Sequence, residues 1–117
     1  MRLSTLFGLA GLAASAAADS MVVYVFCTTA SCNYMDGRWT TAFGTYYVDS
    51  RDGCKDPADV PGLNNLCIDW SHMRGHFYFD NQAKRCLHMD TFEWDASCYT
   101  DQTSCYTSRW SEVPCTW

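Results

Sequence analysis

Eight cysteines that all follow an apolar N-terminal segment constrain the fold of this 117-residue chain more than any other feature. The segment starts with a basic residue, Arg2, continues through a leucine-containing run and ends in small residues up to Ala18. A signal peptidase accepts alanine at the third-last and last positions of such a segment, and the apolar run is too short to span a bilayer. We therefore expect residues 1–18 to be a signal peptide and residues 19–117 to form a single secreted, extracellular, disulfide-rich domain.

An even number of cysteines in a short exported chain is typical of a disulfide framework. We expect every cysteine to be paired, although the sequence does not choose the partners. No C-x-x-C pair occurs, which argues against a zinc site, and we expect neither a metal nor a cofactor. The cysteines concerned are Cys27, Cys32, Cys54, Cys67, Cys86, Cys98, Cys105 and Cys115.

The balance of charges narrows the class of partner. The chain has thirteen acidic and eight basic residues, a net charge of −5, and its only lysines are Lys55 and Lys84. Binding to nucleic acid or to an anionic membrane needs clustered Lys and Arg, and no such cluster occurs. We expect a soluble protein whose partners are neither nucleic acids nor membranes.

Short apolar segments rich in β-branched and aromatic residues, separated by Gly, Pro, Asn and Asp, are typical of strands and turns. The pattern predicts a mainly β fold: a compact, disulfide-stapled antiparallel sheet or sandwich with at most one short helix, a small α+β arrangement being the alternative. A long loop is expected at residues 49–65, with one helical turn at 57–60 that starts at a proline. The expected strands are residues 21–26, 39–43, 45–48, 66–70, 76–80, 84–88, 92–99 and 104–110.

The clearest local pattern lies in residues 75–88. Phe77 and Phe79 alternate with polar neighbours, a turn is expected at Asn81, and a second alternating segment follows. Alternation of this kind places both phenylalanines on one face of a strand. We expect an antiparallel hairpin with Phe77 and Phe79 directed toward the core.

Histidines are the first residues to consider for metal binding or catalysis. His72 and His76 are spaced as H-x-x-x-H, which on a helix places two imidazoles on one face. Gly75 interrupts the spacing, and the acid of the metalloprotease motif is missing. We interpret these histidines as surface residues at the entry to a strand.

A small secreted ribonuclease is the enzyme class that the composition resembles most. Such an enzyme needs a general base, a general acid and a cation for the developing charge, and His88, Glu93 and Arg109, with His76, are the candidates. The guanyl-specific fungal ribonucleases carry a second histidine near the end of the chain, whereas no histidine follows His88 here. We therefore expect no catalytic residues and no enzymatic activity.

Aromatic residues are abundant, with five tryptophans and seven tyrosines. A small disulfide-rich domain does not have the interior to bury all of them, and exposed aromatics beside charged residues mark contact sites for protein or sugar. The predicted contact residues are Trp94, Trp110 and Trp117.

A leader at residues 1–18, eight cysteines after it, an acidic balance and many aromatics together resemble fungal small secreted cysteine-rich proteins of the effector or elicitor type. The resemblance covers the whole chain, is one of format, and assigns no site residues. The resemblance implies a non-enzymatic virulence protein that binds a component of a host plant and modulates the defence of that host. The alternative is a module that binds chitin or another cell-wall glycan, which should show a planar row of Trp or Tyr rather than a mixed patch. A ribonuclease is the third hypothesis.

Overall fold

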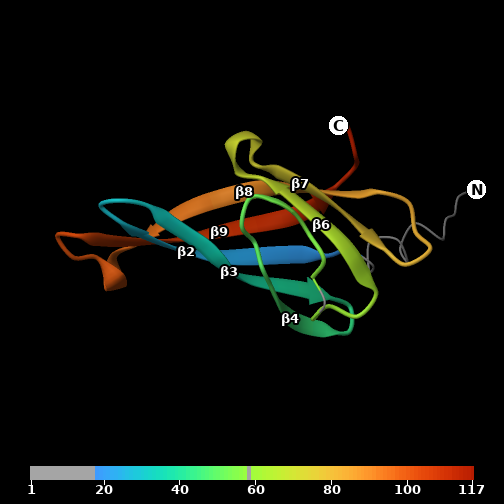
Figure 1. Cartoon of the computed structure of the whole chain (residues 1–117), viewed down its shortest axis with the longest axis horizontal. Coiled ribbons are helices and arrows are strands. Elements are labelled where there is room, and N and C mark those ends of the chain that lie inside the picture. Colours follow the sequence, from blue (N-terminus) through green and yellow to red (C-terminus); the bar gives the residue numbers. More distant parts are fainter. Residues whose placement is uncertain (1–17, 58) are drawn as a thin grey trace, which may run out of the picture.

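The computed structural model describes residues 18–57 and 59–117 as one antiparallel sheet of eight strands, in the order β4-β3-β2-β9-β8-β7-β6-β5 (Figure 1). The predicted mainly β fold is confirmed, as a single curled sheet. Two short 3-10 turns, η1 (Trp70–His72) and η2 (Ala96–Cys98), are its helical elements among these residues. The strands are β2 (Ser20–Thr28), β3 (Cys32–Thr41), β4 (Gly44–Val48), β5 (Gly53–Lys55), β6 (Leu63–Asp69), β7 (Arg74–Phe79), β8 (Arg85–Asp95) and β9 (Thr103–Val113).

Strand β2 lies in the middle of the sheet, between β3 and β9. Its burial alternates strictly: Met21, Val23 and Val25 are buried on the inner face, whereas Tyr24 and Phe26 face outward. This two-residue period follows from strand geometry, and the β-branched residues of β2 fit it. The inner face of β2 thus forms the floor of the core.

The sheet curls so that its inner face packs against itself. The rings of Trp39 on β3 and Phe77 on β7 are 4.8 Å apart, although β2, β9 and β8 separate the two strands within the sheet. Both side chains are fully buried. The two edge strands, β4 and β5, are joined by residues 49–52 alone, which can span no more than about 18 Å. The edges of the sheet therefore lie near each other. Figure 1 shows β4 and, in green, the segment that leaves it toward the other edge.

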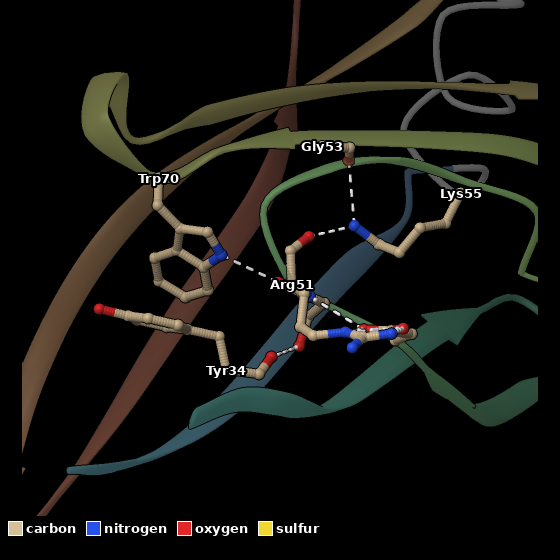
Figure 2. A network of polar contacts seen from close by, with 7 residues as sticks. Tyr34, Arg51, Gly53, Lys55 and Trp70 are labelled. Carbon is tan, nitrogen blue, oxygen red and sulfur yellow. Dashed lines mark hydrogen bonds and ion pairs between the residues drawn. The ribbon is translucent and has the colours of Figure 1, made fainter. Parts of the chain in front are cut away.

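A polar network, which we call the seam, closes the gap between the two edges (Figure 2). Ser50 is fully buried and its hydroxyl donates to the carbonyl oxygen of Tyr34 on β3. Its own carbonyl accepts a 2.8 Å hydrogen bond from Trp70 Nε1, after β6. Lys55 Nζ donates to the carbonyl oxygens of Arg51 and Gly53. The hydrogen bonds of Ser50 therefore connect the two edges of the sheet.

All eight cysteines are paired, as the sequence predicts, and no cysteine is free. Two of the bridges join residues directly opposite each other on neighbouring strands, a third holds the C-terminal segment to β8, and the fourth closes the end of the β8–β9 hairpin. The pairs are Cys27–Cys32, Cys54–Cys67, Cys86–Cys115 and Cys98–Cys105.

The predicted hairpin of residues 75–88 is confirmed as the β7–β8 pair, with Asn81 at positive φ in its turn. Phe77 is fully buried, but Phe79 is only partly buried against the core, so the expectation for Phe79 is too strong. The predicted strands at 84–88 and 92–99 are joined in one strand, β8, whose register shifts between Met89 and Thr91. This strand ends at Asp95, so the prediction of a strand up to residue 99 is wrong where η2 begins. The predicted loop at 49–65 contains the short strand β5 and the first residues of β6.

Two sequence predictions fall on residues that the structure does not describe. The signal peptide at residues 1–18 lies outside the described residues except for its last residue, Ala18. The helical turn at 57–60 includes residue 58, which is also outside them. Val60 donates its N–H to the carbonyl oxygen of Pro57, and Leu63 donates to that of Val60, so this part of the chain turns twice before β6.

Candidate functional site

The prediction that Trp110 is an exposed contact residue is wrong. Trp110 is 2% exposed and lies on the inner face of β9, opposite Met21. Its Nε1 donates to Ser108 Oγ at 2.9 Å, and its ring meets the edge of Trp70 at 5.1 Å. The indole is therefore a core residue with a satisfied N–H, which leaves it unavailable to a partner.

Trp117 is also less available than predicted, because it is partly buried. The bridge between Cys86 and Cys115 holds the C-terminal segment on the outer face, and the Arg74 guanidinium lies 5.3 Å from the Trp117 ring. The Trp117 carbonyl oxygen accepts a hydrogen bond from Lys84, whereas its buried indole N–H has no hydrogen-bond partner among the residues that the structure describes. Trp117 therefore packs on β7 and is a poor contact residue.

Trp94 is exposed as predicted, with 55% of its surface accessible. It stands on β8 next to Tyr99, with ring centroids 5.6 Å apart and the planes at 75°. Phe92, on the same face of β8, stacks on Tyr106 of β9 at 4.8 Å and 21°. We call Phe92, Trp94, Tyr99 and Tyr106 the aromatic patch. Sequence reasoning missed all but Trp94, although the alternation of Phe92 and Trp94 shows that they share a face.

The position of the patch follows from the register of the β8–β9 hairpin. Trp94 is opposite Tyr106, and Phe92 is opposite Ser108, so the patch continues the inner face of the sheet past the core. Figure 1 shows the hairpin, in orange and red, reaching the end of the molecule beside the β2–β3 turn. The aromatic side chains there have no opposing wall of the sheet to cover them fully, and Trp94 and Tyr99 are more than half exposed.

Local bonds hold the end of this hairpin in one conformation. Asp95 caps η2 by accepting from the backbone N–H of Ser97 at 2.9 Å and from its hydroxyl at 2.7 Å. These hydrogen bonds lower the pKa of Asp95, which keeps its carboxylate charged. The bridge between Cys98 and Cys105 spans the same end. The patch is thus carried on a preorganised support, which reduces the entropy lost on binding.

The patch lies in an acidic part of the chain. Residues 90–108 contain Asp90, Glu93, Asp95 and Asp101, but no lysine or arginine. Glu93 and Asp95 alternate with the aromatic residues of β8, so they point to the opposite face of the hairpin. A ligand at the patch therefore meets aromatic surface on one face of the hairpin, with the carboxylates of Glu93 and Asp95 on the other face.

The two histidines of the H-x-x-x-H spacing, which the sequence interpretation assigns to the surface, do not lie together on a helix. His72 ends η1 and lies 2.7 Å from the Asp69 carboxylate through Nδ1, whereas His76 lies on β7. Burial, followed by the charge of Lys84, lowers the pKa of His76. Among the residues that the structure describes, no group of three or more His, Cys, Asp or Glu side chains is arranged to hold a metal ion.

The residues of the ribonuclease hypothesis are partly brought together. Three of them share the outer face of β8 and β9, because residues that are directly opposite each other in the sheet point to the same side. The three are His88, opposite Ser111, Glu93, opposite Thr107, and Arg109, opposite Thr91. His76 lies one strand further, on β7. The residues of β8 that follow Leu87 on this outer face are exposed to solvent.

Three of the cavities in the described part of the chain lie away from His88, Glu93 and Arg109, although Tyr106 of the aromatic patch lines the first of them. One of about 310 Å³ is on the outer face beside Tyr24 and Phe26, and one of about 440 Å³ lies between Phe43 and Arg85. The third, of about 280 Å³, adjoins Trp117. None of the three is lined by the exposed ribonuclease candidates of β8 and β9.

Within residues 18–57 and 59–117, no helix has the length and apolar character needed to cross a membrane. In comparisons with known proteins, the chain matches no protein-family model, no curated protein and no solved structure.

Proposed function

We propose that the protein is a secreted, non-enzymatic effector or elicitor that binds a host protein, from a plant, through the aromatic patch. The observation that carries the proposal is the exposure of Trp94 and Tyr99 on a hairpin end braced by a disulfide. Large exposed aromatics on a rigid support are typical of the residues that dominate protein–protein binding energies. The four disulfides agree with export, since such bridges persist in oxidising compartments.

The chemistry of the patch indicates a partner surface that is apolar and basic. Four acidic residues and no basic residue occur in residues 90–108, so a segment with Lys or Arg is attracted to this end of the protein. A guanidinium or ammonium group also binds favourably over the face of an indole such as Trp94. The partner is therefore a protein segment in which Lys or Arg stands beside apolar side chains.

A glycan is the second candidate ligand, and the ring geometry is less favourable to it. Stacking on a sugar needs open ring faces in a common plane. Phe92 and Tyr106 cover one another at an interplanar angle of 21°, and Trp94 and Tyr99 are tilted by 75°. The patch is therefore a mixed aromatic surface rather than a planar row, which favours a protein partner over chitin.

Capture of plant apoplastic proteins on the immobilised secreted protein tests the proposal, with insoluble chitin assayed in parallel. We expect a basic protein to be retained, and its retention to weaken as salt is raised because exposed charges are screened. Trp94→Ala and Tyr99→Ala should each weaken the affinity roughly 30-fold, the loss of about 2 kcal/mol typical of an anchor residue. Phe43→Ala is the matched control, since Phe43 is 92% exposed in the turn between β3 and β4.

Three outcomes would count against this function. Binding to chitin that depends on Trp94 would establish the glycan alternative. An equal loss in the Phe43→Ala control would show that the patch is not the contact site. Cleavage of RNA by the wild type that is lost in His88→Ala or Glu93→Ala would show an enzyme, with the shared face of β8 and β9 as its site.

A further inference from the structure

Asp19, the residue that follows the expected cleavage point, has an ionisable side chain and yet is only 5% exposed. Its carboxylate accepts a hydrogen bond from Trp39 Nε1 at 3.0 Å and lies 3.6 Å from the Arg85 guanidinium. Its backbone nitrogen donates to Glu112 Oε1 at 2.9 Å, and its carbonyl oxygen accepts from the Glu112 N–H at 3.2 Å. The nitrogen of residue 19 is therefore held directly against a carboxylate.

The charges of this cluster do not cancel while residue 19 is inside a longer chain. When both carboxyl groups are ionised, Asp19 and Glu112 supply two negative charges, and Arg85, bonded to Glu112 at 2.7 and 2.8 Å, supplies one positive charge. Burial is the main reason that the pKa of Asp19 is raised, and the hydrogen bond from Trp39 and the charge of Arg85 offset it only in part. An excess negative charge among poorly exposed groups is costly, and one additional cation would cancel it.

We propose that cleavage between Ala18 and Asp19 supplies this cation, because the new α-ammonium group of Asp19 forms an ion pair with Glu112. The cleavage is a hydrolysis: water adds across the peptide bond, Ala18 leaves as a carboxylate, and the freed amine of Asp19 takes up a proton. The nitrogen already lies at hydrogen-bond distance from Glu112 Oε1, so the pair forms without rearrangement. Two positive and two negative charges then balance in one cluster.

The folded structure accommodates a cut at this peptide bond better than a cut at either neighbouring bond. Ala18 is exposed whereas Asp19 is buried, so the environment of the chain changes across the bond that is cut. An amine on Ala18 would be one residue, about 3.8 Å along the chain, further from Glu112. A cut after Asp19 would remove the acceptor of the Trp39 N–H. This inference goes beyond the proposed binding function and depends only on export and cleavage of the leader.

The ion pair makes stability depend on pH in the alkaline range. An unperturbed α-amino group has a pKa of about 7.7–8.0, and a carboxylate at hydrogen-bond distance raises the value in the folded state. The stabilisation is therefore fully present below about pH 7.7 and is lost as pH rises through the folded-state pKa. The other charged or titratable groups around the amine are the Asp19 carboxylate, Arg85 and, across the neighbouring cavity, Tyr46.

The test compares two secreted proteins made from the full coding sequence. One is the wild type, and the other carries Gly-Ser inserted between Ala18 and Asp19, which moves the amine outward and keeps all other groups. We expect the intact mass of the wild type to correspond to a chain that begins at Asp19. We also expect its urea unfolding midpoint to exceed that of the inserted protein at pH 6–7, with the difference vanishing toward pH 10, because urea, unlike guanidinium chloride, does not screen an ion pair. A different N-terminal residue, equal midpoints at pH 6, or a difference independent of pH would overturn the proposal.

A second measurement on the wild type alone covers the case in which the inserted protein does not fold. Reductive methylation with ¹³C-formaldehyde labels the α-amine, Lys55 and Lys84, whose methyl resonances are followed by NMR against pH. The α-amine should titrate above its ordinary range, and titration within or below that range would refute the ion pair. Neither readout requires a binding partner, so failure here and failure of the proposed binding function are distinguishable.

Discussion

Phe77 and Phe79 alternate on the same strand, but their side chains have different surroundings. Phe77 is fully buried and its ring meets Trp39 at 4.8 Å, whereas Phe79 is partly buried at the rim, with Arg85 5.2 Å from its ring. Phe77→Ala should lower the free energy of unfolding by about 3–5 kcal/mol, because a buried phenyl group is replaced by a cavity. Phe79→Ala should lower the free energy of unfolding by clearly less, because the Phe79 ring is only partly buried. Guanidinium unfolding measures both values, and equal losses would contradict the assigned burial.

Glu112 gives the protein an acid-sensitive component of stability. Burial acts to raise the pKa of Glu112, but the hydrogen bonds from Arg85 and from the Asp19 N–H outweigh it, so the pKa is lowered from its ordinary value of 4.5. A lowered folded-state pKa contributes stability above the ordinary value, and this stability is lost as pH falls through the folded-state pKa.

We therefore expect Glu112→Gln to destabilise the protein at pH 6 and the difference from wild type to shrink as pH falls below 4.5. Thermal unfolding between pH 2 and 6 measures it. Asp19, whose pKa is raised chiefly by burial, is present in both proteins. A difference that stays constant down to pH 2 would show that the Glu112 carboxylate is not specifically stabilised by folding.

Whether a tryptophan is buried depends on the face of the strand that it occupies, which its neighbours in sequence do not show. Trp94 and Trp110 have similar polar neighbours in sequence, and only the phase of each strand separates them. In β9 the inner face alternates Tyr106, Ser108 and Trp110, so a buried serine interrupts the apolar pattern. Ser108 is tolerated there because it accepts from Trp110 Nε1 and donates to Val23, a long-range partner that the sequence does not reveal.

The end of the β8–β9 hairpin is the element most relevant to the proposed binding function. Its disulfide closes a short loop, since Cys98 and Cys105 are 7 residues apart. Chain-entropy reasoning assigns such a loop about 2–3 kcal/mol of stability. Replacement of both cysteines by serine should lower the unfolding free energy by that amount and also weaken partner binding, because η2 and Tyr99 lose their support.

The matched control replaces Cys27 and Cys32, whose bridge closes the β2–β3 turn with a similar separation of 5. It should cost comparable stability without affecting ligand affinity. Chemical denaturation and a binding titration of both double variants provide the comparison. A loss of affinity that is the same in the two would indicate general unfolding rather than support of the patch.

Elements were predictable where local pattern and turn chemistry agree. The β7–β8 hairpin combines alternating phenylalanines with Asn81, which tolerates positive φ, and its expected pairing is observed. The sequence predicts two strands where the structure has β8 alone, and Asp90 lies between the two predicted segments. The register shift between Met89 and Thr91 accommodates this residue, as a bulge does, and the strand continues. Strand β5 has no pattern of its own, since it is only Gly53–Lys55 and is held to β6 through Cys54.

The arrangement of the whole sheet depends on pairings between distant parts of the chain. Strand β2 pairs along its full length with β9, more than seventy residues later, and this pair joins the two halves of the sheet. No local pattern in either strand indicates that the other is its partner. The sequence therefore predicts an antiparallel sheet but not the order of its strands. The position of the aromatic patch could not be predicted for the same reason: it exists because β8 and β9 extend past the part of the sheet that curls over the core.

Closure of the sheet at the seam is a property of the whole molecule, and it depends on one small side chain. The Ser50 hydroxyl donates to the Tyr34 carbonyl oxygen on β3, next to one edge strand. The Ser50 carbonyl oxygen accepts from Trp70 Nε1, which follows β6, next to the other edge strand. A Cβ on Gly37 would lie 2.9 Å from Ser50 Oγ, which shows how closely the segment packs on β3. Loss of the hydroxyl leaves the Tyr34 carbonyl without this donor while the rest of the sheet keeps its pairing.

Ser50→Ala should therefore cost about 1–3 kcal/mol, the penalty for leaving a buried acceptor without its donor, and should loosen the seam locally. Hydrogen exchange followed by mass spectrometry should show faster exchange in residues 44–55, at the two edges of the sheet, and unchanged exchange in the central strands β2 and β9. Ser108→Ala is the matched control, since Ser108 is also fully buried but bonds to Val23 and Trp110 at the centre. Its effect should appear in β2 and β9 and spare the edges. Faster exchange throughout the sheet in the Ser50 variant would mean that the seam does not open separately, and that closure and core formation are one cooperative event.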